Sequence, residues 1–162
     1  MSPPQPAVEL ELRDLAATES LARALAPRAH RGDVIALRGP LGVGKTTFAR
    51  AFIHGRAGGD AVREVPSPTF TLVQTYDLPG CPVWHFDLYR LEDPDEAWEL
   101  GIEEGFAEAI SLVEWPERLG GHLPERRLDV ELLAGPAPDA RRVRLSGGPD
   151  WLRRLAGLNG DV

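Results

Sequence analysis

The segment from Gly39 to Thr46 has the residue types and the spacing of a phosphate-binding loop. It reads Gly-Pro-Leu-Gly-Val-Gly-Lys-Thr and matches the pattern G-x-x-x-x-G-K-[ST] in full. Glycines allow a backbone to wrap so tightly that successive N–H groups point at one anion, and a helix beginning at the lysine adds the positive end of its dipole. We therefore expect this loop to bind the phosphates of ATP.

Lys45 is the single lysine of the chain, in which the other 17 of the 18 basic residues are arginine. A planar guanidinium does not replace a compact ammonium on a flexible stem, so we expect Lys45 to reach the β- and γ-phosphates. The Thr46 hydroxyl is expected to bind Mg²⁺, a cation that takes few protein ligands. The residues predicted to bind the nucleotide are Gly39, Gly42, Val43, Gly44, Lys45, Thr46 and Thr47.

Two acidic residues belong to apolar segments that read as strands. Glu114 follows the apolar run 109–113, and ligands of open α/β sheets lie at the carboxyl ends of strands, so Glu114 is a candidate for Mg²⁺ or its waters. A capping or surface carboxylate is the alternative. Asp87 lies in the aromatic segment 83–89, where an aspartate needs a partner. That partner could be Arg90 or a backbone amide, or an attacking or Mg²⁺-bound water.

Three further residues near these segments have less specific signals. Alternation places His85 on the same face as Asp87, and we interpret it as a strand histidine with a structural partner. Thr69, in Ser67-Pro-Thr69, could meet the γ-phosphate as a switch residue, although an ordinary entry into a strand is the alternative. Trp115 could border the site because it adjoins Glu114.

The elements that position these residues form an α/β pattern. The apolar run Val34–Leu37 predicts a buried strand, and a helix is expected from about 45 to 55. Further strands are expected at 8–12, 69–76, 83–89, 109–113, 128–133 and 141–145 and helices at 18–28, 93–101 and 150–156, with Thr18 as an N-cap and a capping box at Asp93–Glu96. We predict one α/β domain over residues 1–162, with mobile ends at about 1–7 and 158–162.

The composition limits the class of protein. A length of 162 residues, with 43% hydrophobic and 27% charged residues, is typical of one soluble globular domain. The single cysteine, Cys81, excludes an internal disulfide and fits a reducing compartment. We see no signal peptide and no run of about 18 apolar residues, so we expect a cytoplasmic protein with no membrane contact. The net charge of −7 argues against a surface built to bind nucleic acid.

Four segments in chain order resemble the TsaE (YjeE) family. They are Gly39–Phe48, Ser67-Pro-Thr-Phe70, His85-Phe-Asp-Leu-Tyr-Arg-Leu91 and Val113-Glu-Trp-Pro-Glu117. The resemblance implies a single-domain P-loop NTPase fold, with a mixed central sheet and flanking helices. It also implies the Mg²⁺-dependent ATPase of bacterial tRNA threonylcarbamoyladenosine biosynthesis, which acts with TsaD and TsaB and meets tRNA indirectly through that complex.

The resemblance also implies roles for single residues. Thr46 and Glu114 would be the magnesium ligands, Asp87 the carboxylate needed for hydrolysis and Thr69 the switch threonine. The chain departs from the family pattern at Pro40, where aspartate is frequent. Two other functions remain open from the residues alone. One is a small-molecule or nucleotide kinase, and the other is a nucleotide-gated binding module in which hydrolysis is incidental.

Overall fold

The computed structural model describes residues 7–58 and 71–162. The strands are β1 (Ala7–Leu12), β2 (Val34–Arg38), β3 (Val73–Tyr76), β4 (Val83–Asp87), β5 (Ile110–Glu114), β6 (Leu128–Ala134) and β7 (Arg141–Ser146). The α-helices are α1 (Leu15–Leu25), α2 (Lys45–Ala57), α3 (Ile102–Glu108), α4 (Pro149–Arg154) and α5 (Leu158–Asp161). Three short 3-10 helices are η1 (Ala26–Arg28), η2 (Pro94–Leu100) and η3 (Pro116–His122).

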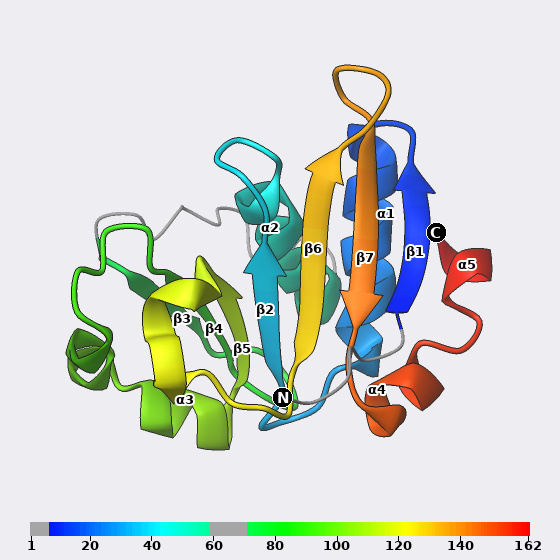
Figure 1. Ribbon diagram of the computed structural model, residues 1–162. Helices are drawn as coiled ribbons and strands as arrows, with labels where there is room; N and C mark the ends of the chain where they lie inside the picture. The colour runs from blue at the N-terminus through cyan, green and yellow to red at the C-terminus, as the bar shows by residue number, and fades with distance from the viewer. Residues whose placement is uncertain (1–6, 59–70) are drawn as a thin grey trace.

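The strands that lie within these ranges form one mixed sheet in the order β1-β7-β6-β2-β5-β4-β3. Strands β6, β2, β5 and β4 run parallel to one another, whereas β7 and β3 pair antiparallel with β6 and β4, and β1 pairs antiparallel with β7. Figure 1 shows α1 and α2 together behind the sheet, and α3 beside the β3–β4–β5 end. The predicted single-domain P-loop fold with a mixed sheet and flanking helices is therefore confirmed.

Each face of the sheet carries its own apolar cluster. Alternate residues of β2 point to opposite faces, so Ile35 and Leu37 pack with α1 and α2, whereas Val34 packs with Phe86 and Val113. The four residues Val34–Leu37 are all buried because both faces of this central strand are covered. The central position of β2 fixes the start of the loop that follows it.

The parallel pairing of β2, β5 and β4 brings their carboxyl ends to one edge of the sheet. In the register of these strands Leu37 lies opposite Glu114, and Glu114 lies opposite Asp87. The two carboxylates that the sequence singled out therefore lie on adjacent strands, beside the point at which β2 enters the glycine-rich loop. This arrangement is the one expected for a ligand site of an open α/β sheet.

The first helix begins earlier than the sequence pattern predicted. Asp14, not Thr18, is the N-cap of α1, because the Asp14 Oδ1 atom accepts the Ala17 N–H at 2.8 Å. Thr18 lies one turn further on and is buried against the core. The prediction of Thr18 as N-cap was wrong because an aspartate four residues earlier accepts a free N–H of the first turn.

The short helices η2, α3 and α5 differ in how well the sequence predicted them. The capping box at η2 is present as predicted, with reciprocal bonds between Asp93 and Glu96. The short helix α3 follows directly at Ile102 and was not predicted. Residues from 158 onward, expected as a mobile end, form α5, and Leu158 is buried in the core.

In the described parts of the chain, no helix has both the length and the apolar character that a membrane crossing requires.

Replacing Asp14 by alanine tests the assignment of the helix cap. We expect Asp14→Ala to lower the free energy of unfolding by about 1 kcal/mol, because the first turn of α1 loses its side-chain acceptor. Asp14→Asn is the matched control and should keep most of the stability, since asparagine caps helices equally well. Urea unfolding followed by circular dichroism measures both variants. An Asp14→Ala variant as stable as the unmodified chain would show that Asp14 does not cap α1.

Candidate functional site

The loop between β2 and α2 depends on glycine for two different reasons. At Gly39 the φ angle is +143°, and a Cβ atom would lie 2.5 Å from the Leu132 carbonyl oxygen, so a side chain would collide with β6. At Gly44, with φ of +118°, the space is open and the constraint is conformational. Val43 is buried, and its carbonyl accepts a hydrogen bond from Arg141 Nε at 2.6 Å, which ties the loop to β7.

Lys45 begins α2 and is folded back over its own loop. Its Nζ atom donates to the carbonyl oxygens of Gly39 at 2.5 Å and Pro40 at 2.9 Å. The same atom lies 4.0 Å from the centroid of the Trp115 ring, a cation–π contact. Burial lowers the pKa of the Lys45 ammonium from its usual value, and the nearby carboxylates, Glu114 foremost, oppose that shift. A phosphate in the loop would replace these carbonyl acceptors with stronger ones.

Thr46 and Glu114 are in direct contact. The Thr46 hydroxyl lies 2.8 Å from Oε1 and 3.1 Å from Oε2 of Glu114, so the first turn of α2 is joined to the carboxyl end of β5. Glu114 is 3% exposed and also accepts a hydrogen bond from His85 Nε2 at 2.7 Å. A hydroxyl and a carboxylate side by side are hard oxygen donors of the kind that Mg²⁺ prefers, so this pair fits that cation.

Asp87 completes the site from β4. Its side chain is 6% exposed, and Oδ1 accepts the Tyr89 N–H at 3.2 Å, which orients the carboxylate. A cavity of about 360 Å³ lies between the loop and the ends of β4 and β5. The residues that line it are Leu41, Gly42, Gly44, Lys45, Thr46, Thr47, Asp87, Tyr89, Arg90, Glu114 and Trp115.

Most of the residues singled out in the sequence meet in this cavity. The exceptions are Gly39 and Val43, which shape the loop without lining the cavity, His85, which contacts Glu114 but does not line the cavity, and Thr69, which lies outside the described residues. Two aromatic residues that the sequence left without a firm role also line it. The rings of Tyr89 and Trp115 are 5.0 Å apart, and Trp115 adopts a φ of +58°, which turns the chain sharply after β5.

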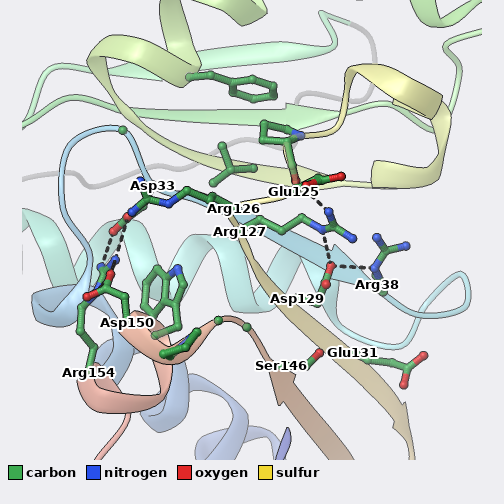
Figure 2. Close-up of a pocket in the computed structure, with 18 of the residues that line it drawn as sticks. Asp33, Arg38, Glu125, Arg126, Arg127, Asp129, Glu131, Ser146, Asp150 and Arg154 are labelled. Atoms are coloured by element: carbon green, nitrogen blue, oxygen red, sulfur yellow. Dashed lines mark hydrogen bonds and ion pairs between the residues drawn. The ribbon is translucent and has the colours of Figure 1, made fainter. Parts of the chain in front are cut away.

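A larger cavity of about 900 Å³ lies elsewhere, between β2, β6 and α4 (Figure 2). Six arginines of the described part of the chain line it, and three of them, Arg38, Arg127 and Arg154, are paired with carboxylates of the same cavity. Asp129 accepts from both Arg38 and Arg127, and Arg154 donates to Asp33 and Asp150. The smaller cavity is therefore the better candidate for binding a phosphate group, because the glycine loop, the start of α2 and Lys45 all line it or border it.

The fold and the site together define a class of protein. A buried parallel strand leads through a glycine-rich loop into a helix, and carboxylates from two neighbouring parallel strands face the start of that helix. These features are those of a P-loop nucleotide-binding domain.

Comparison with known proteins places the chain within this class. Residues 12–143 match the family model described as threonylcarbamoyl adenosine biosynthesis protein TsaE, and the chain belongs to that family. It is 40% identical over 115 residues to the tRNA threonylcarbamoyladenosine biosynthesis protein TsaE of Rickettsia bellii, covering 71% of this chain and 78% of the relative. The protein of the same name from Bacillus subtilis is 40% identical over 114 residues, or 70% and 69% of the two chains.

A solved structure agrees with the family assignment. The crystal structure of YdiB from Bacillus subtilis superposes with a TM-score of 0.75 at 27% sequence identity, and the match covers 98% of both chains. The resemblance to the TsaE (YjeE) family that the four sequence segments indicated is thus confirmed.

The contact between Lys45 and Trp115 predicts an optical signal for nucleotide binding. We expect ATP with Mg²⁺ to change the tryptophan emission, because Lys45 leaves the face of the Trp115 ring as it turns to a phosphate. Trp115→Phe should abolish this change. Trp98→Phe is the matched control and should preserve it, since Trp98 lies on η2 beside His122 and outside the cavity. An unchanged signal in Trp115→Phe would contradict this movement of Lys45.

Proposed function

We propose that this protein is the Mg²⁺-dependent ATPase of the bacterial machinery that makes tRNA threonylcarbamoyladenosine. The observation that carries the proposal is the contact between the Thr46 hydroxyl and the Glu114 carboxylate at 2.8 Å, at the start of a helix that follows a phosphate loop. The names of the relatives support the pathway, and the residues in the cavity support the chemistry.

The binding step follows from the loop. The backbone N–H groups at the start of α2 and the Lys45 ammonium hold the phosphates. Thr46 and Glu114 would hold Mg²⁺ directly or through its waters. Held there, the cation would supply electrostatic stabilisation of the charge that develops on the phosphate oxygens during transfer.

The hydrolytic step is assigned to a carboxylate of β4. Asp87 lies opposite Glu114 in the strand register and lines the same cavity, which supports a role in orienting an attacking water. We assign Thr69 as the switch threonine that meets the γ-phosphate, on the basis of the family motif alone. The partners proposed are TsaD and TsaB, and the net charge of −7 fits a tRNA contact made indirectly through them.

Replacing Asp87 tests whether binding and hydrolysis can be separated. We expect Asp87→Asn to bind ATP and Mg²⁺ within about threefold of the unmodified protein and to form ADP at least ~100-fold more slowly, because it loses the water-orienting carboxylate. Titration calorimetry measures binding, and a coupled assay measures ADP. Asp77→Asn, on the exposed turn after β3, is the matched control and should leave both unchanged. Lost ATP affinity, or unchanged ADP formation, in Asp87→Asn would overturn the assigned role.

The same assay with purified TsaD and TsaB tests the pathway and the two alternative functions. We expect ADP formation to rise when both partners are added, and Asp87→Asn to fail in a reconstituted tRNA modification assay. A rate that ignores the partners would favour a kinase acting on another acceptor. Modification that proceeds normally with Asp87→Asn would favour a module that needs only bound nucleotide.

A further inference from the structure

His85 occupies a position that packing alone does not explain. It lies in the middle of β4, is fully buried and makes its hydrogen bond to Glu114 across the parallel pair β4–β5. The second ring nitrogen, Nδ1, is also buried and has no hydrogen-bond partner among the described residues. A leucine or phenylalanine would fill the same space without leaving a buried nitrogen unpaired. The unpaired Nδ1 lowers the stability of the fold. A functional reason for the imidazole is therefore to be sought in its bond to Glu114.

The direction of that bond follows from the chemistry of the acceptor. An ionised carboxylate only accepts, so Nε2 carries the hydrogen and donates it to Oε2 at 2.7 Å. The other carboxylate oxygen, Oε1, accepts from the Thr46 hydroxyl at 2.8 Å. The Glu114 carboxylate is thus held from both sides, by β4 through Oε2 and by α2 mainly through Oε1, with the Thr46 hydroxyl also 3.1 Å from Oε2. With His85 removed, Thr46 would be the remaining side-chain partner of this carboxylate among the described residues.

We propose that His85 is a positioning residue that sets the affinity of the site for Mg²⁺. It fixes the plane of the Glu114 carboxylate so that one oxygen stays beside Thr46, and a preoriented ligand loses less freedom when the cation binds. This inference rests on the proposed function, because it requires that Thr46 and Glu114 hold the cation. Partners that hydrogen-bond to metal ligands act in this way in other proteins, and their loss typically costs 10- to 100-fold in metal affinity.

The chain provides a control for the alternative that His85 merely supports the sheet. Ser111 lies on β5, is fully buried like His85 and has an unpartnered hydroxyl in the described structure. It pairs with Trp84 in the β4–β5 register, one residue before His85, but does not contact Thr46 or Glu114 through a described hydrogen bond. Ser111→Ala therefore removes a buried polar group from the same pair of strands, on β5, without changing a residue of the proposed metal site.

The test compares three substitutions at position 85 through the Mg²⁺ requirement of nucleotide binding. His85→Leu removes the donor. His85→Gln carries an amide N–H at nearly the same reach as Nε2, whereas the amide of His85→Asn is one methylene shorter. The affinity for ADP is measured by calorimetry in EDTA and at a series of Mg²⁺ concentrations, and the half-saturating Mg²⁺ concentration is the readout.

We expect His85→Leu and His85→Asn to raise the half-saturating Mg²⁺ concentration by about 10- to 100-fold. The affinity for ADP in EDTA should stay within about threefold, and His85→Gln and Ser111→Ala should resemble the unmodified chain. An equal loss of affinity with and without Mg²⁺ would indicate a structural role only and would overturn the proposal. So would a His85→Gln variant as impaired as His85→Asn.

The comparison of His85→Gln with His85→Asn, and the Mg²⁺ dependence of the unmodified chain, separate the possible outcomes. If His85→Leu does not fold, the pair His85→Gln and His85→Asn decides the question, since both are polar and differ by one methylene. An unmodified chain whose ADP affinity ignores Mg²⁺ would overturn the proposed function together with this inference. A Mg²⁺-dependent unmodified chain with no shift in any variant would overturn the role of His85 alone.

Discussion

The hydrogen bond between Thr46 and Glu114 depends on every level of the fold. It joins the first turn of α2 to the end of β5, and it requires that β2 and β5 be parallel neighbours so that loop and strand end at the same edge. The loop must also turn within a few residues, which Gly39 permits by lying directly against the Leu132 carbonyl of β6. The packing on both faces of the sheet therefore holds the Thr46 hydroxyl next to the Glu114 carboxylate.

Four ionisable side chains are buried around this bond in an otherwise apolar core: Lys45, His85, Asp87 and Glu114. Burying such groups costs free energy unless each finds a partner. Here Lys45 uses loop carbonyls and the Trp115 ring, while Glu114 uses Thr46 and His85. The partners of Lys45 and Thr46 are groups that a bound nucleotide and its cation can replace. Three arginines of the larger cavity, Arg38, Arg127 and Arg154, are instead paired with carboxylates (Figure 2).

The parts of this site that the sequence predicted are those encoded by local spacing. The loop and Lys45 are contiguous in sequence, and Glu114 could be predicted because it ends an apolar strand. The bond between His85 and Glu114 could not, because it depends on which strands are neighbours and in what register. Thr18 was predicted as the cap of the first helix, but Asp14 accepts the Ala17 N–H and the helix begins one turn earlier, with Thr18 buried inside it. Helix α3 has only seven residues directly after η2, too few for a clear periodic pattern.

The most direct test of this account is a crystal structure with Mg²⁺ and a non-hydrolysable ATP analogue. We predict the phosphates in the loop Gly39–Gly44, with Lys45 Nζ moved from the Gly39 and Pro40 carbonyls onto a phosphate oxygen. The Thr46 hydroxyl should lie about 2.1 Å from Mg²⁺, with Glu114 bound to the cation or to one of its waters. A nucleotide bound in another cavity, or a cation that contacts neither Thr46 nor Glu114, would contradict the account.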